Sequence, residues 1–198
     1  MCFHLKVPVI CQMFNVGLIK KTPGIIMRNI EIKAVIRDIE HTISKATELS
    51  DTAQTEIKQH DIFFKTKEGR LKLRKFKDGT AELILYKRPD VSGPKLSTYD
   101  KVSLNSDIVE SIESILTQSN GILGVVKKTR LLFIAGQTRI HIDKVDGLGN
   151  FIELEVVLKE DQDIITGQKI ADDLMQALFI KKDDLIAEAY IDLLNSKT

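Results

Sequence analysis

Polar and apolar residues alternate along much of the chain from residue 29 onward, as they do in β-strands whose two faces meet different surroundings. In residues 29–36, three isoleucines and Ala34 fall on one side, while Glu31 and Lys33 fall on the other. Alternation and β-rich composition predict further strands at 60–66, 70–74, 81–87, 125–134, 139–143 and 151–156. Several of these strands would carry one apolar face and one ionic face.

Turn signals separate the strands and indicate that neighbours are mostly antiparallel. Asp78-Gly79 lies between two runs and predicts a hairpin turn, and residues 147–150 join two others. Helical spacing with one apolar face is present four times, at Ile39/Ile43/Leu49, Ile108/Ile112/Ile115/Leu116 after a Ser106 cap, Ile170/Leu174/Leu178 and Leu185/Ala189/Leu193. We therefore expect an α+β fold in which an antiparallel sheet turns its apolar side chains outward beneath amphipathic helices.

The ionic faces differ in sign from strand to strand. Arg70, Lys72 and Arg74 share one side of their strand, whereas Glu153 and Glu155 project together from another. A polar strand face usually meets solvent in antiparallel sheets, and a basic strand read alone is more often a solvated face or a nucleic-acid patch. Solvated faces tend to mix both signs with Thr and Ser, so segregation by strand indicates a binding site.

Composition narrows the class of protein. The 198 residues are enough for one domain, and 29 basic residues nearly balance 28 acidic ones, so nucleic acid is not an expected partner. The two cysteines, Cys2 and Cys11, cannot form a disulfide framework and indicate a reducing compartment, which favours the cytoplasm. The chain has no apolar run of about 20 residues, so we expect no membrane span.

The first 30 residues differ from the rest because they contain four basic residues and no acidic one. This shift predicts a flexible leader or extension at 1–26, ahead of a domain at 27–198. Basic segments poor in acids are typical of mitochondrial transit peptides, but Ser and Arg are scarce here. We therefore favour a simple extension over a targeting leader.

The two charge sets fit a metal-assisted triphosphate site. A triphosphate carries about four negative charges and needs several cations along its length. The strands offer Lys33, Lys72, Arg74, Arg88, Lys128, Arg130 and Arg139. Candidate oxygen ligands for Mg²⁺ or Mn²⁺ are Glu31, Asp143, Glu153 and Glu155. His141 has no second histidine at a metal-binding spacing, so we expect it to be structural or to support a ligand.

These charged motifs follow one another in a fixed order between Met27 and Leu194. They are Glu31-x-Lys33, Lys72-x-Arg74, Tyr86-x-Arg88-x-Asp90, Lys128-x-Arg130, Arg139-x-x-x-Asp143, Gly147-Leu-Gly149 and Phe151-x-Glu153-x-Glu155. The series resembles the CYTH group of triphosphate tunnel metalloenzymes, which contains class IV adenylyl cyclases and thiamine triphosphatases. The resemblance implies an eight-stranded antiparallel barrel forming an open tunnel, and it assigns the basic set to phosphates and the acidic set to one or two metal ions.

One position departs from the family pattern, because Asn29 replaces the first Glu of the family's opening Glu-x-Glu-x-Lys. This change removes a charge from the metal end of the tunnel, so a second metal ion would bind weakly. The resemblance also makes a homodimer possible. The sequence identifies no general base.

Three functions fit the same tunnel. Hydrolysis of an inorganic or organic triphosphate is placed first, and cyclisation of ATP to cyclic AMP and pyrophosphate is the alternative. A noncatalytic binder of polyphosphate or nucleotide ranks third, because it would not need all four carboxylates. The chain lacks Trp, which argues against thiamine triphosphate as a dedicated substrate.

Overall fold

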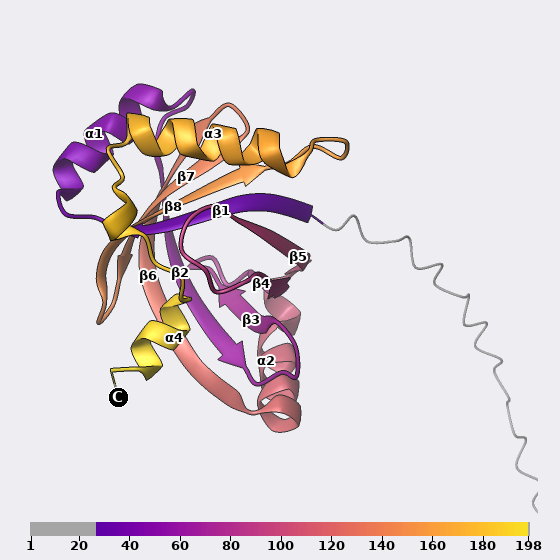
Figure 1. Ribbon diagram of the computed structural model, residues 1–198. Coiled ribbons are helices and arrows are strands. Elements are labelled where there is room, and N and C mark those ends of the chain that lie inside the picture. The colour runs from indigo at the N-terminus through magenta and orange to yellow at the C-terminus, as the bar shows by residue number, and fades with distance from the viewer. Residues whose placement is uncertain (1–26, 198) are drawn as a thin grey trace, which may run out of the picture.

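Eight antiparallel strands close into a barrel in a computed structural model that describes residues 27–197 (Figure 1). The extension expected at 1–26 lies outside the described residues, so the domain boundary stays a prediction. Around the barrel the order is β1-β5-β4-β3-β2-β6-β7-β8, which confirms the predicted barrel. The strands are β1 Met27–Val35, β2 Thr55–Phe64, β3 Arg70–Lys75, β4 Ala81–Lys87, β5 Lys95–Leu104, β6 Ile122–Ala135, β7 Thr138–Val145 and β8 Gly149–Val157.

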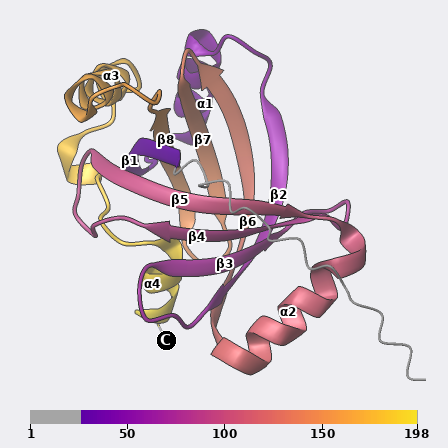
Figure 2. The same ribbon diagram turned by 90° about the vertical axis from the view of Figure 1, so that its right-hand side faces the viewer.

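The hydrophobic core lies outside the barrel, between its outer face and the helices. Ile30 and Ile32 of β1 pack with Leu154 of β8 against Ala171 and Met175 of α3 (Ile164–Ala177), beside α1 (Ile39–Leu49). A second cluster places α2 (Ser106–Asn120) over the outer faces of β2 to β5 (Figure 2). Because the apolar side chains face outward to these helices, the ionic side chains face inward, as the alternation predicts.

One strand was not predicted from the alternation, namely β5. Its outward positions include Thr98 and Asp100, and its outward Val102 is exposed, so the strand has no continuous apolar face. Backbone pairing to β1 and β4 fixes this strand instead. The resemblance, which implied eight strands, supplied the element that the pattern lacked.

Two helix boundaries also differ from the predictions. Residue Asn105, not Ser106, precedes α2, and its side chain forms no cap hydrogen bond. The helix expected across Leu185 to Leu193 begins only at α4 (Tyr190–Asn195), after a short 3-10 turn, η1 (Lys182–Asp184). The reason is that the intervening backbone pairs with β1: Leu185 bridges Ala34, and the Ile186 amide donates to the Lys33 carbonyl oxygen.

The C-terminal segment covers one end of the barrel, whereas the resemblance implied an open tunnel. Ala189, Tyr190 and Ile191 pack with Phe63 and Phe151, which lie where β2 ends and β8 begins. Gly124 of β6 permits this approach, because a Cβ there would lie 2.5 Å from Ile191 Cδ1. The opposite end of the barrel lies where β2 begins and β3 ends.

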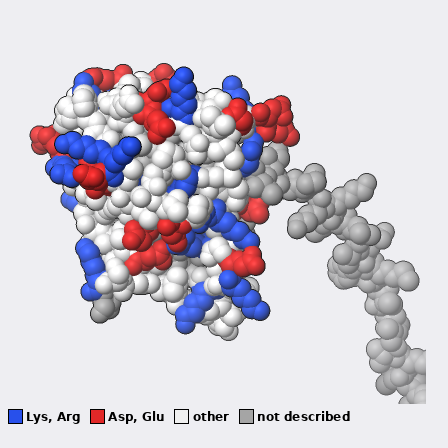
Figure 3. Space-filling model, viewed as in Figure 1, with Lys and Arg blue, Asp and Glu red and all other residues white. Residues whose placement is uncertain are grey.

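The outer surface carries no field of one sign in the view of Figure 3, where basic and acidic side chains are interspersed. No helix within residues 27–197 is long and apolar enough to cross a membrane.

Candidate functional site

A cavity of about 360 Å³ runs inside the barrel and is lined by side chains from all eight strands. Eight basic and five acidic side chains line it, leaving an excess of three positive charges. A wall of this kind, in surroundings of low dielectric constant, attracts an anion strongly. The cavity therefore has the electrostatic character of a polyanion site.

All seven cations predicted to contact phosphates line this cavity, and each already pairs with an acidic side chain or a carbonyl oxygen. Arg139, for example, lies 2.8 Å from Glu155 and donates a 3.2 Å hydrogen bond to Tyr99. Opposite charges inside one cavity compensate each other when no ligand is bound, which makes so ionic an interior tolerable.

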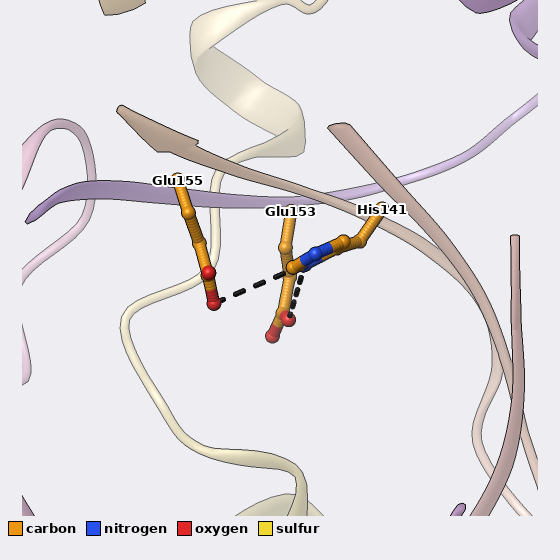
Figure 4. A group of neighbouring side chains, drawn as sticks. All are labelled: His141, Glu153 and Glu155. Atoms are coloured by element: carbon orange, nitrogen blue, oxygen red, sulfur yellow. Dashed lines mark ion pairs between the residues drawn. The ribbon is translucent and has the colours of Figure 1, made fainter. Parts of the chain in front are cut away.

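Three side chains form a candidate metal site, namely His141, Glu153 and Glu155 (Figure 4). Their ligand atoms lie within 4.8 Å of one another, and His141 Nδ1 is 3.9 Å from Glu153 and 3.8 Å from Glu155. Burial, together with Arg130, lowers the pKa of His141, which favours the neutral imidazole that can ligate a cation. His141 was expected to be structural or to support a ligand, and its place between two carboxylates was not predicted.

The charge state of the carboxylates is set by their neighbours. Burial opposes ionisation of Glu153, but Lys33, Arg130 and Lys128 outweigh it and hold its pKa well below the usual range. Glu31, which faces Glu155 across the β1–β8 pair, behaves differently. Burial raises the pKa of Glu31, although Arg88 at 3.3 Å opposes this. Glu153 therefore stays negatively charged. Glu31 lies beside the candidate site but is not one of its three closely spaced side chains.

Asp143 was predicted to be a metal ligand, which stays a prediction; in the structure its carboxylate pairs with two cations. Its carboxylate is completely buried and does not line the cavity. It accepts hydrogen bonds from Arg130 Nε and Nη2 at 2.6 Å, from Lys128 at 3.0 Å and from the Tyr190 hydroxyl at 3.0 Å. Tyr190, which donates one of these hydrogen bonds, itself lines the cavity. Asp143 anchors two cations of the wall.

Polar atoms without partners gather at the cavity wall. Among residues 27–197, five buried side-chain atoms have no hydrogen-bond partner, and four of them belong to Asn29, Gln59, Arg139 and His141, which line the cavity. Buried polar groups in proteins nearly always form hydrogen bonds, so a cluster of buried atoms without partners indicates that a ligand binds beside them. Arg139 Nε calls for an acceptor, whereas Asn29 Oδ1 and His141 Nδ1 call for a cation or a donor.

The two ends of the cavity differ. At the end covered by the C-terminal segment, three cations donate to consecutive backbone carbonyls: Lys95 to Ile186, Arg88 to Ala187 and Lys33 to Glu188. The wall at the other end is partly apolar, formed by Ile57, Phe76, Ile84 and Leu132. Sequence reasoning missed this apolar section, as well as Asp61, Lys101 and Tyr190; Lys101 lies on the unpredicted β5, and Tyr190 comes from the C-terminal segment.

Comparisons with known proteins agree with this geometry. The model of the CYTH domain family matches residues 27–190. A protein of Methanocaldococcus jannaschii, named as a proposed adenylate cyclase, is 28% identical over 180 residues, which cover 84% of this chain and 98% of that protein.

Two solved structures illustrate the shared fold. A protein of Pyrococcus horikoshii superposes with a TM-score of 0.69 at 22% identity, covering 83% of this chain and 98% of that one. A proposed adenylyl cyclase from Hippeastrum, described as having a dominant triphosphatase activity, gives a TM-score of 0.61 at 15% identity, with 86% and 96% covered. At these identities the likeness concerns the fold.

Proposed function

Since this chain belongs to the CYTH domain family, we propose that it is a divalent-metal-dependent enzyme that hydrolyses a triphosphate bound inside its barrel. The observation that carries this proposal is the cluster of unpartnered polar atoms at a wall with three excess positive charges. A triphosphate has about four negative charges, and one divalent cation beside it leaves a complex that such a wall compensates.

The metal site would be formed by His141, Glu153 and Glu155, with Asn29 and Glu31 beside them. The unpartnered His141 Nδ1 between two carboxylates fits a divalent cation. Mg²⁺ prefers oxygen ligands, so the imidazole favours Mn²⁺ of the two candidates. When bound, the cation supplies Lewis-acid polarisation of phosphate oxygens and lowers the pKa of bound water.

The cations of the wall would bind and orient the phosphate chain. Phosphoryl transfer depends mainly on positioning and on compensation of charge at the leaving oxygens. Arg139 has an unpartnered N–H and pairs with Glu155, whereas Lys33 and Arg88 pair with Glu153 and Glu31 and also donate to the C-terminal segment. The remaining members of the proposed phosphate-binding set are Lys72, Arg74, Lys128 and Arg130.

A second candidate function, cyclisation of a nucleoside triphosphate, is favoured by the apolar section at the uncovered end. Ile57, Phe76 and Leu132 could pack against a base, and Gln59 Oε1 is buried without a partner there. Inorganic triphosphate would leave this section unused. The same section would also suit the organic part of a substrate that is hydrolysed.

Product analysis separates these functions. The protein is incubated with Mg²⁺ or Mn²⁺ and inorganic triphosphate, ATP or thiamine triphosphate, and products are resolved by chromatography. We expect phosphate release without cyclic AMP; cyclic AMP with pyrophosphate would establish the cyclase instead. Binding of triphosphate without turnover would indicate a noncatalytic binder.

Carboxylate variants test the metal site in the same assay. Glu155→Gln removes a proposed ligand charge while keeping its size, and turnover should fall by about 100-fold or more. The matched control is Glu160→Gln, whose side chain is exposed after β8 and outside the cavity, and which should retain wild-type turnover. A Glu155→Gln variant with wild-type rates and metal dependence would contradict the proposal.

A further inference from the structure

Two buried aspartates hold two Lys-x-Arg pairs in the same geometry. On β2, Asp61 accepts from Arg74 Nε and Nη2 at 2.8 Å and from Lys72 Nζ at 2.9 Å. On β7, Asp143 accepts from the Nε, Nη2 and Nζ atoms of Arg130 and Lys128. In both cases the aspartate faces the arginine directly across an antiparallel strand pair.

The two arrangements have different surroundings. Asp143 is also bound by the Tyr190 hydroxyl and lies behind the wall, which gives it a structural role at the covered end. Asp61 lines the cavity, is 2% exposed and binds only Lys72 and Arg74 among the residues that the structure describes. The contacts of Asp61 therefore indicate one role, which is to hold these two cations in place.

The hydrogen bonds to Asp61 fix the direction of the Arg74 guanidinium. A guanidinium has five N–H donors in one plane, and Asp61 takes two of them through Nε and Nη2. Within the described part of the chain Arg74 forms no other hydrogen bond, so its remaining donors are available at the cavity wall. A fixed fork loses less conformational entropy on binding an oxyanion than a free one.

Asp61 also opposes repulsion among the cations. Burial and the neighbouring Arg74 lower the pKa of Lys72 to about 8, while Asp61 acts in the opposite direction. Lys72 faces Asp61 on β2, Arg74 on β3 and Lys128 on β6, and its ammonium lies 5.6 Å from the Tyr86 ring on β4. Without the carboxylate, Lys72 would face only cations and the uncharged rings of Tyr86 and Phe63.

We propose that Asp61 is a positioning residue for triphosphate recognition, which holds Lys72 and Arg74 in the orientation that meets substrate phosphates without touching the substrate itself. This inference rests on the proposed function and adds a residue to it. The side chain acts through two hydrogen-bonded cations, so its loss should affect substrate binding more than the chemical step.

The test is Asp61→Asn, which keeps the volume but turns an amide toward two cations. For inorganic triphosphate with Mn²⁺, we expect KM to rise about 10- to 100-fold, the range of a lost charge-assisted hydrogen bond, while kcat changes by less than about 3-fold. The rise of KM with pH should also begin at lower pH than in the wild type, because Lys72 loses its supporting charge. A merely structural role would not move this pH profile.

The matched control is Glu113→Gln, which removes the partner of Lys75 at 2.7 Å on the outer face of the same strand. It should leave KM and its pH profile unchanged. Asp61→Glu keeps the carboxylate and should give an intermediate KM, and it decides the matter if Asp61→Asn does not fold. Wild-type KM and pH profile in the folded Asp61 variants would overturn the inference, whereas a wild-type protein that neither binds nor hydrolyses triphosphate would overturn the proposed function.

Discussion

Replacing Asp143 by Asn tests whether this carboxylate is a buried anchor or a metal ligand. In the structure it accepts four hydrogen bonds and compensates Lys128 and Arg130, which are themselves buried. Breaking a buried ion pair by removing one partner costs about 3–5 kcal/mol. Arg130 keeps Glu153 as a second partner, so we expect about 3 kcal/mol here. For a chain of this size that lowers Tm by about 6–12 °C.

The assay is thermal and urea unfolding, followed by circular dichroism in EDTA so that no metal contributes. Burial disfavours ionisation of Asp143, but Arg130 and Lys128 hold its pKa well below the usual range. A depressed folded pKa stabilises the protein above the unfolded pKa of about 4, and this stabilisation is lost as the pH falls further. The difference between wild type and variant should therefore be complete at pH 7 and shrink below about pH 4.

Asp146→Asn is the matched control, because Asp146 is exposed three residues further along the same hairpin. It should change stability by less than about 0.5 kcal/mol. The reasoning is refuted if Asp143→Asn unfolds at the wild-type temperature in EDTA but loses the stabilisation that Mn²⁺ gives the wild type. That result would show that Asp143 is a metal ligand.

Three further predictions concern packing, pH and the covered end. Gly167→Ala should lower the free energy of unfolding by about 1–3 kcal/mol in urea titrations, because its Cβ would lie 2.5 Å from Leu158 and 2.8 Å from Ile30; an unchanged midpoint would contradict this close packing. Wild-type KM for triphosphate should rise as the pH passes about 8, where Lys72 loses its proton, and a flat profile from pH 7 to 9 would argue against its charge in binding. Tyr190→Phe should cost about 1 kcal/mol by losing the bond to Asp143, whereas Tyr190→Ala should cost about 3–5 kcal/mol; equal losses in thermal unfolding would contradict the packing of its ring on Phe151.

The sequence predicted the barrel well because its alternation reports a physical difference between the two faces. Ile30 and Ile32 are buried against helices while Glu31 and Lys33 line the cavity, as the period of two requires. The strand β5 escaped this reasoning because Thr98 and Asp100 interrupt its outward apolar face. Alternation detects a strand only where both faces have a consistent character.

The site was predictable in composition and less so in arrangement. The seven cations line the cavity, because inward position follows from strand period. Asp143 is not part of the group formed by His141, Glu153 and Glu155, and it accepts a hydrogen bond from Tyr190, which reaches the barrel end from the C-terminal segment. A contact of this kind joins residues 47 positions apart and leaves no local signal in the sequence.

The most direct test of the proposed site is an anomalous difference map from crystals soaked with MnCl₂ and inorganic triphosphate. We predict a Mn²⁺ peak among His141, Glu153 and Glu155, with phosphate density beside it against Arg139 and the basic wall. A map in which Mn²⁺ avoids these three residues, or in which triphosphate binds outside the barrel, would contradict the proposed site.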